Sequence, residues 1–453
     1  MKVFLKTYGC QMNVRDSEAL AGMLAGEGHE IVSAEADADV MIFNTCSVRE
    51  QAERKAIGKI GFMKKYKKLK PNLVIGVIGC MAQNRGEELL EKLPHLDFAL
   101  GTGQLHRLPE IIAAVRNEHR RMAELQSSPA VLNAMGTHYS TPETRPYSAF
   151  IAVTRGCNRF CSYCIVPYVR GREISRDMSD IIAEAQMLAA SGVREIMLLG
   201  QNVAAYGWHG NVNPPPDDVS PFADLLTELV RIDGIKRIRF TSPYPTYFNA
   251  KLIRVMAETP KICRNVHLPL QSGSAAVLKA MNRQYTPEQY CAIASALRQA
   301  MPEITFSTDV IVGFPGETED DFRATRAVMN EVGFDNAYIF KYSPRRGTKS
   351  AEQTDDVPQE VKEERNRILL EDLEARCIAS NQAYVGKTVE VMFDGVSPRN
   401  AERYAGKTST AKTVVFTPQP GLKPGDLVNI PIERAGRVTL FGPGLIDPAE
   451  ELL

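Results

Sequence analysis

The chain has 453 residues, 44% hydrophobic and 24% charged, an ordinary globular composition with room for about three domains. Its 54 Lys and Arg balance its 54 Asp and Glu, which excludes a uniformly basic nucleic-acid binder, so any such surface is local. The sequence shows neither a charged-then-apolar leader nor a bilayer-length apolar run, which predicts a cytoplasmic protein. Because thiols stay reduced there, the nine cysteines are expected to be ligands, catalysts or core residues.

The first part of the chain alternates short apolar runs with helical patterns. Strands that alternate with helices indicate a parallel sheet, so we predict an N-terminal α/β domain over residues 1–118. A linker with Ser, Pro and Thr is predicted over residues 119–142. The predicted strands are 2–8, 39–45 and 73–79, and the predicted helices are 16–27 and 50–69.

A second, longer series of βα units occupies residues 143–378. Six units are too few for the usual closed eight-fold barrel, so we predict an open, partial (β/α)6 barrel. Helical patterns such as 177–190 and 317–331 fill the gaps between its strands. The predicted strands are 148–154, 195–199, 237–241, 266–270, 305–312 and 336–342.

The third region changes to short β runs separated by glycines. A long charged helix at 359–383 leads into it, and the runs are typical of a small antiparallel β-barrel over residues 380–446. The fold class is therefore α/β with a C-terminal barrel. The predicted strands are 388–393, 413–416 and 427–432.

Three cysteines lie in RGCNRFCSYC, directly after the first strand of the second region; we call Cys157, Cys161 and Cys164 the loop triad. The C-x3-C-x2-C spacing lets three thiolates reach three corners of one iron–sulfur cubane. A structural zinc site needs a fourth protein ligand, and none stands nearby; a zinc knuckle or incidental cysteines are the alternative. A cluster held by three cysteines keeps one iron open, which can chelate the amino and carboxylate groups of S-adenosylmethionine.

Three other cysteines share one structural position, at the end of a predicted parallel strand. Cys10, Cys46 and Cys80, which we call the strand-end triad, follow KTYG, FNT and VIG. Carboxyl ends of parallel strands form one edge of the sheet, so the three thiols can converge on a second cluster. The alternative is that each is a buried small apolar residue. Cys263, Cys291 and Cys377 have no such placement and are predicted to pack in the core.

The motifs resemble those of a known family. RGCNRFCSYC is similar to the cluster loop of the radical S-adenosylmethionine superfamily, and with YGCQMN, NTCSVRE and VIGC the chain resembles the methylthiotransferases. YGCQMN and NTCSVRE are most similar to the MiaB branch, which acts on isopentenyl-adenosine next to the anticodon. The stretch GKTSTAKTVVF resembles a TRAM domain, an RNA-binding barrel. The resemblance covers essentially the whole chain, with three domains in the expected order.

The resemblance implies an enzyme that attaches a methylthio group to carbon 2 of an adenosine in tRNA, with two 4Fe–4S clusters and two molecules of S-adenosylmethionine. One molecule would methylate a sulfur at the strand-end triad. The second would be cleaved at the loop triad, and the resulting 5′-deoxyadenosyl radical would remove the hydrogen from carbon 2. Because the cofactors do this chemistry, no catalytic general acid or base is nominated.

Further residues are predicted from the family motifs and from charge. Those expected near S-adenosylmethionine are Tyr163, Gly200, Gln201, Asn202, Gly313 and Glu317. Those expected to bind RNA are Lys64, Lys65, Lys67 and Lys68 in MKKYKKLK, Arg170 and Arg172 after the loop triad, and Lys407 and Lys412 in the TRAM-like stretch. Where that family usually has Arg, Arg and Asn, the chain has Lys407, Ser409 and Ala411.

The expected partners are a tRNA, an external electron donor such as flavodoxin or ferredoxin, and a sulfur source, with the chain acting as a monomer. Two other substrates fit the same chemistry, threonylcarbamoyl-adenosine and an aspartate of a ribosomal protein, but YGCQMN argues against both. A different class, an RNA-binding iron–sulfur sensor without turnover, is disfavoured because a sensor does not need a pocket for S-adenosylmethionine.

Overall fold

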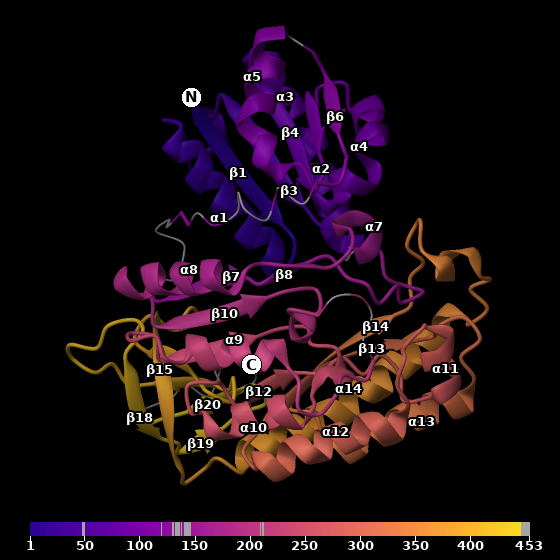
Figure 1. Cartoon of the computed structure of the whole chain (residues 1–453), viewed down its shortest axis with the longest axis vertical. Helices are drawn as coiled ribbons and strands as arrows, with labels where there is room; N and C mark the ends of the chain where they lie inside the picture. Colours follow the sequence, from indigo (N-terminus) through magenta and orange to yellow (C-terminus); the bar gives the residue numbers. More distant parts are fainter. Residues whose placement is uncertain are drawn as a thin grey trace.

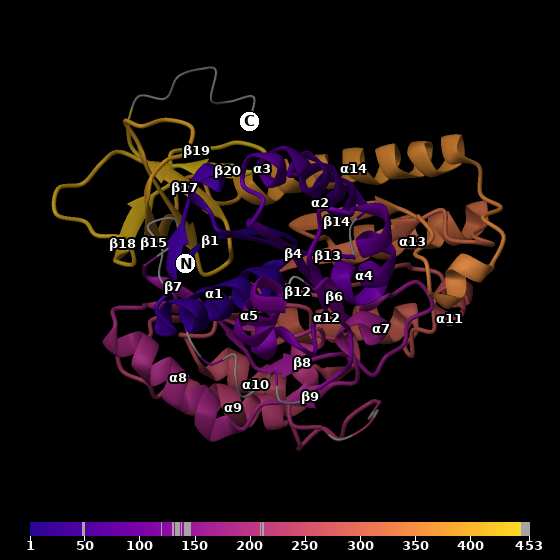
Figure 2. The same ribbon diagram turned by 90° about the horizontal axis from the view of Figure 1, so that it is seen from above.

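The computed structural model describes residues 1–47, 50–118, 120–128, 131, 136, 138–139, 146–208, 210 and 213–444. Three units follow one another along the chain. In Figure 1 the N-terminal unit lies at the top, the long central unit fills the middle, and the yellow C-terminal sheet lies beside it at the lower left. Figure 2, seen from above, shows the N-terminal unit over the central one and the yellow sheet to one side. Among the described helices, none is long and apolar enough to cross a membrane.

The N-terminal unit is a six-stranded parallel sheet with the order β2-β1-β3-β4-β5-β6. Both β3 and β4 are buried along their whole length because helices cover both faces of the sheet. The strands are β1 (Lys2–Tyr8), β2 (Glu30–Val32), β3 (Val40–Thr45), β4 (Val74–Gly79), β5 (Phe98–Leu100) and β6 (Met122–Glu124). The helices are α1 (Gln11–Gly26), α2 (Glu50–Phe62), α3 (Lys64–Leu69), α4 (Cys80–Lys92) and α5 (Leu108–Glu118).

The predicted strands and the parallel sheet are confirmed, whereas the predicted boundary of this unit is wrong. Residues 122–124, expected in the linker, form β6 and pair in parallel with β5. The run is short and carries Glu124, so it lacks the apolar pattern that marks the longer strands. Much of the rest of the predicted linker lies outside the described residues.

The central unit holds six parallel strands in two sheets of three, β11-β10-β7 and β12-β13-β14. Backbone hydrogen bonds join the sheets, because Ile238 of β11 donates to Lys261 and accepts from Cys263, just before β12. The strands are β7 (Ser148–Ala152), β10 (Glu195–Leu199), β11 (Arg237–Phe240), β12 (Asn265–His267), β13 (Thr305–Val312) and β14 (Asn336–Lys341). This arrangement confirms the partial (β/α)6 barrel.

Helices pack around these strands, and a short hairpin lies at the mouth. The helices are α7 (Val166–Arg170), α8 (Met178–Ala190), α9 (Pro221–Leu229), α10 (Ala250–Glu258), α11 (Ala275–Ala280), α12 (Pro287–Ala300), α13 (Glu319–Val332) and α14 (Gln359–Gln382). The hairpin pairs β8 (Thr154–Arg155) with β9 (Ile174–Ser175) and encloses the cluster-loop motif and α7.

The C-terminal unit is a six-stranded sheet with the order β18-β15-β16-β17-β20-β19. Its pairs are antiparallel, as predicted, except that β17 and β20 run parallel. The sheet curls around an apolar core that includes Phe393, Phe416 and Ile430. The strands are β15 (Thr388–Val396), β16 (Tyr404–Thr408), β17 (Thr413–Phe416), β18 (Leu427–Pro431), β19 (Arg434–Ala435) and β20 (Thr439–Phe441).

The turn between β16 and β17 docks this sheet on the amino-terminal ends of the barrel strands. Arg239 of β11 donates from Nη2 to the Thr408 carbonyl over 2.8 Å and from Nε to Glu195 over 2.8 Å. Lys412 pairs with Asp335, the residue before β14, over 3.0 Å. In parallel barrels active sites lie at the carboxyl ends of the strands. This contact lies at the amino-terminal ends, so we expect it to stabilise the fold and not to take part in the site.

We predict that Arg239→Met lowers the free energy of unfolding by about 3 kcal/mol, because it leaves the buried Glu195 carboxylate without its cation. Arg231→Met is the matched control, since Arg231 also pairs with a glutamate, Glu228, over 2.6 Å, but its side chain is 67% exposed. That exposed pair is worth at most about 1 kcal/mol. Calorimetry of both full-length variants tests the difference; equal unfolding temperatures would contradict the docking role of Arg239.

Candidate functional site: two cysteine triads at a domain interface

The strand-end triad lies at one edge of the N-terminal sheet. Cys10 is the N-cap of α1 and lies two residues after the end of β1, Cys46 follows β3, and Cys80 is the first residue of α4 directly after β4. Because β1, β3 and β4 are parallel neighbours, their carboxyl ends place the three thiols together. Cys46 and Cys80 are buried, and Cys10 is half-buried.

The thiols of this triad interact with one another. A hydrogen bond with the Cys46 side chain lowers the pKa of Cys10 to about 5, and the positive charge of Arg170 acts in the same direction. Burial raises the pKa of Cys80, again opposed by Arg170. Thiolates rather than thiols bind metals, so the low pKa favours the form of Cys10 that can act as a metal ligand.

Two buried asparagines hold the strand ends in place. Asn13 accepts from the Cys10 thiol over 3.3 Å and donates to the Asn44 side chain over 3.0 Å. Asn44 donates in turn to the Asn13 carbonyl and to Ser17, each over 2.9 Å. Both asparagines are fully buried, and their bonds tie α1 to the end of β3. Neither asparagine was predicted as a site residue, although both stand close to a cysteine, in CQMN and NTC.

The loop triad lies on the segment between β8 and α7. Gly156 allows the loop to close, since it has φ +81° and a side chain there would lie 2.1 Å from the Arg172 carbonyl oxygen. The backbone amide of Cys157 donates to the Gly171 carbonyl over 3.1 Å, and that of Cys164 to the Cys161 carbonyl over 3.0 Å. Burial raises the pKa of Cys157 and of Cys164 to about 12, and the neighbouring cysteines of the triad add to both shifts.

Two arginines place positive charge beside the loop triad. Arg283 points a guanidinium nitrogen at the Cys161 sulfur over 3.6 Å and stacks on Tyr244, with 4.5 Å from its central carbon to the ring centroid. Arg159 stacks on the same ring over 4.2 Å and on the Tyr247 ring over 4.9 Å. Sequence reasoning gave no signal for Arg283 or the tyrosines, because they come from distant parts of the chain.

Among the described residues, no three His, Cys, Asp or Glu side chains come close enough to hold one metal ion. The remaining cysteines lie elsewhere, Cys291 on α12, Cys377 on α14 and Cys263 buried just before β12.

The elements that carry the two triads pack against each other across the interface between the N-terminal unit and the barrel. Cys80 packs in one apolar cluster with Ile165 and Val169, and Ile165 directly follows Cys164. Figure 1 shows α7 and β8 directly beneath the N-terminal sheet. The Thr102 hydroxyl of the N-terminal unit donates a hydrogen bond to the Val169 carbonyl of α7, which adds a polar contact to this interface.

Of the residues predicted near S-adenosylmethionine, three follow β10 and lie beside the loop triad. The Gln201 side chain accepts a hydrogen bond from the Gly156 amide over 2.5 Å. At position 200 only glycine fits, because a Cβ atom there would lie 2.2 Å from the Thr154 hydroxyl oxygen. Within the described residues, the buried Thr154 hydroxyl and the Asn202 amide nitrogen have no hydrogen-bond partner. Such orphaned polar atoms indicate that a polar ligand belongs there.

The other three contact the opposite half of the barrel. The Tyr163 ring packs against a small apolar cluster that includes Phe314. Glu317 accepts from the Gly313 amide over 2.6 Å and pairs with Arg365 over 2.7 Å. Glu317 is 5% exposed; its Oε2 makes both contacts, whereas its buried Oε1 has no hydrogen-bond partner among the described residues.

Two residues predicted to bind RNA are buried, which corrects their assignment. Arg170 is 7% exposed and pairs with Asp16 over 3.1 Å, and Lys412 is 9% exposed and pairs with Asp335. Neither presents its charge to a phosphate at the surface. Of the others, Lys67 pairs with Asp97, Lys407 is half-buried on β16, and Lys64, Lys65, Lys68 and Arg172 are exposed.

A cavity of about 380 Å³ opens beside both triads. It includes Ser47, next to Cys46, and Ile165, next to Cys164. Four arginines and one glutamate, Glu53, line it: Arg54 and Arg85 come from the N-terminal unit, and Arg345 and Arg346 from the loop after β14. Arg85 pairs with Glu53, and Arg346 pairs with Glu88. The lining therefore carries an excess of positive charge and spans the interface.

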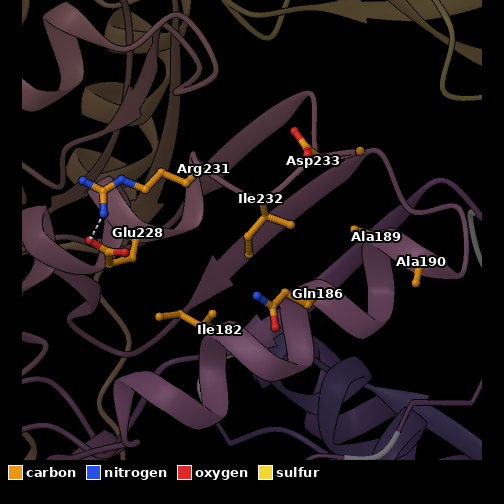
Figure 3. A pocket seen from close by; sticks show the side chains of 9 residues that line it. Ile182, Gln186, Ala189, Ala190, Glu228, Arg231, Ile232 and Asp233 are labelled. Carbon is orange, nitrogen blue, oxygen red and sulfur yellow. Dashed lines mark hydrogen bonds and ion pairs between the residues drawn. The ribbon is translucent and has the colours of Figure 1, made fainter.

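A larger cavity of about 610 Å³ lies away from the cysteines. Figure 3 shows it open between α8, which carries Ile182 and Gln186, and the turn that carries Arg231 and Asp233. No residue of either triad lines it, so its size does not make it the site.

Family models match the chain in three consecutive parts: "Uncharacterized protein family UPF0004" at residues 2–101, "Radical SAM superfamily" at 151–329 and "TRAM domain" at 382–443. Curated relatives named tRNA-2-methylthio-N(6)-dimethylallyladenosine synthase match almost end to end. The relative from Opitutus terrae is 43% identical, covering 97% of each chain, and that from Methylacidiphilum infernorum is 44% identical, covering 100% of this chain and 96% of the relative. The chain belongs to this synthase family.

A solved structure supports the fold of the barrel. The radical S-adenosylmethionine methyltransferase TsrM from Kitasatospora setae, with a tryptophan substrate and an analogue of S-adenosylmethionine bound, superposes with a TM-score of 0.58. It is 17% identical and covers 75% of this chain and 72% of its own. Family membership confirms that the chain is a radical S-adenosylmethionine enzyme with the three domains predicted from its motifs.

We predict that, in metal-free protein, iodoacetamide modifies Cys10 much faster than Cys157 at about pH 6.5, because only a thiolate reacts and the two pKa values lie on opposite sides of that pH. Both side chains are half-buried, so access is comparable. Peptide mass spectrometry measures the two rates. Below about pH 4 Cys10 becomes protonated and should lose its advantage; an equal rate for both cysteines at about pH 6.5 would contradict the low pKa of Cys10.

Proposed function

We propose that the chain transfers a methylthio group to carbon 2 of N6-isopentenyladenosine next to the anticodon of tRNA, using two 4Fe–4S clusters and two molecules of S-adenosylmethionine. One observation carries the proposal: in a member of this synthase family, two groups of three cysteines meet at a single domain interface. Each group leaves one position of a cubane without a cysteine ligand, which suits one cluster that binds S-adenosylmethionine and one that presents sulfur.

In this proposal Cys157, Cys161 and Cys164 hold one cluster, and Cys10, Cys46 and Cys80 hold the other. When bound, the cofactors supply the electron, the radical and the sulfur. The chain's own residues provide position and charge. Asn13 and Asn44 fix the strand-end triad, and Arg283 offsets the negative charge of the loop triad.

Burial of the triads keeps bulk water away from them. Cys46, Cys80 and Cys161 are each at most 8% exposed. Exclusion of water protects reactive species from side reactions and strengthens the electrostatic effect of neighbouring groups. The Thr154 hydroxyl and the Asn202 amide, both orphaned beside the loop triad, are proposed to bind the polar end of S-adenosylmethionine.

The basic cavity is the proposed entry for the RNA. Arginine binds phosphates through a planar, bidentate guanidinium group. Four arginines line the cavity, whose wall also includes a residue next to a cysteine of each triad. The exposed Lys64, Lys65 and Lys68 lie beyond the far end of α2, whose length is about 20 Å. A continuous RNA stem can therefore contact the cavity and the lysines together.

The remaining partners are proposed from the chemistry. Reductive cleavage of S-adenosylmethionine consumes an electron, so the enzyme needs an external donor such as flavodoxin or ferredoxin. The transferred sulfur must be replaced by a sulfur source. The chain carries both triads itself, and we propose that it acts as a monomer.

The decisive experiment analyses tRNA nucleosides by mass spectrometry from cells that lack the protein. We predict that 2-methylthio-N6-isopentenyladenosine disappears while N6-isopentenyladenosine accumulates. The wild-type gene should restore it, whereas Cys46→Ala or Cys161→Ala should not. Loss of a modified threonylcarbamoyl-adenosine instead would assign the sibling activity, and unchanged nucleosides together with no reductive cleavage of S-adenosylmethionine would indicate a sensor.

We predict that Arg345→Gln combined with Arg346→Gln weakens tRNA binding and reduces the dependence of log affinity on log salt by about one to two, because each lost phosphate contact removes roughly 0.7–0.9 from that slope. Arg231→Gln in the cavity of Figure 3 is the control and should leave the slope unchanged. Binding titrations of unmodified tRNA at several salt concentrations measure it. Equal slopes for the double variant and the wild type would exclude the cavity as the phosphate site.

A further inference from the structure

We propose that Arg170 is a positioning residue for the strand-end triad, supplied by the barrel domain: its guanidinium donates to the sulfur-rich group held by Cys10, Cys46 and Cys80. This inference rests on the proposed function, because it assumes a cluster at that triad. It assigns a role to a residue that motif reasoning placed at the RNA surface. Arg170 is the last residue of α7, the short helix that directly follows the loop triad.

Arg170 makes a buried contact across the interface. Its Nη2 donates to Asp16 of α1 over 3.1 Å, with both side chains at most 3% exposed. The same guanidinium interacts with the Cys80 thiol and with the charge of Cys10. Arg170 thus belongs to the chain segment of one triad and lies against the thiols of the other.

Arg170 also has an unused hydrogen-bond donor. Among the described residues, the Arg170 Nη1 nitrogen is buried and has no hydrogen-bond partner. A buried donor of a charged group left unsatisfied is costly, so such groups are found where a ligand completes them. A bound cluster supplies sulfur acceptors beside Cys80, and these can take the Nη1 hydrogens.

The buried charges around Arg170 are not balanced by protein carboxylates. Asp16 is the acidic partner of two arginines, Arg155 and Arg170, each over 3.1 Å, and all three side chains are at most 7% exposed. One carboxylate neutralises one of the two cations. An uncompensated buried charge is strongly unfavourable, and an anionic thiolate cluster beside Arg170 provides the missing negative charge.

Arg155 offers a matched control. It binds the same carboxylate over the same distance, but its remaining guanidinium bond goes to the Thr102 carbonyl over 2.6 Å. Arg155→Lys therefore perturbs the Asp16 group while leaving Arg170 beside the cysteines. Arg170→Lys keeps the positive charge but has no planar fork, and Arg170→Met removes the charge as well.

The test uses full-length protein in which Cys157, Cys161 and Cys164 are replaced by Ala, so that iron reports the strand-end triad alone. Hydrogen bonds and positive charge beside the sulfurs favour the reduced, more negative cluster. We expect Arg170→Met to shift the midpoint potential to more negative values, Arg170→Lys to shift it less, and Arg155→Lys to leave it unchanged. Release of iron to a chelator should be several-fold faster in Arg170→Met than in Arg155→Lys.

Two outcomes separate the inference from the proposed function. If the triple-alanine protein binds no iron after anaerobic reconstitution, the strand-end triad holds no cluster and the proposed function itself fails. If it binds about four iron, and neither Arg170→Lys nor Arg170→Met changes the potential or the electron paramagnetic resonance spectrum, only the role of Arg170 is overturned. Should Arg170→Met fail to fold, the comparison of Arg170→Lys with Arg155→Lys decides alone.

Discussion

The buried contact of Asp16 with Arg155 and Arg170 joins the N-terminal unit to the barrel. Charged groups taken out of water tolerate little displacement, because losing a partner inside a protein costs several kcal/mol. Further buried polar contacts cross the same interface. This polar network sets the orientation of the N-terminal sheet on the barrel. Apolar packing of Cys80 against Ile165 adds to it but, being non-directional, cannot set the orientation.

Sequence reasoning was strongest where local patterns decide the structure. Buried parallel strands carry continuous apolar runs, so β1, β3 and β4 and the position of a cysteine after each could be predicted. The confirmed barrel follows from the same logic. The short edge strand β6 was not predicted, because its three residues end in a glutamate and form no continuous apolar run.

The site was less predictable wherever side chains from distant segments meet. Arg283 and Tyr244 join the loop triad only through the fold, and nothing near either residue in the sequence signals a ligand. Charge alone misassigned Arg170 and Lys412, because a basic residue in a polar stretch looks the same whether it faces solvent or a buried carboxylate. The burial of a cation depends on its partner, and the partner is a tertiary feature.

The docking of the C-terminal sheet also affects how the protein forms during synthesis. Domains generally fold from the N-terminus as the chain emerges, yet Asp16 must wait for Arg155 and Arg170, and Asp335 must wait for Lys412. Each of the first two units therefore emerges from the ribosome with a charge whose partner has not yet been made. The interface between the N-terminal unit and the barrel can form as soon as the barrel has been translated. The contacts at the amino-terminal ends of the barrel strands form only when almost the whole chain has been translated.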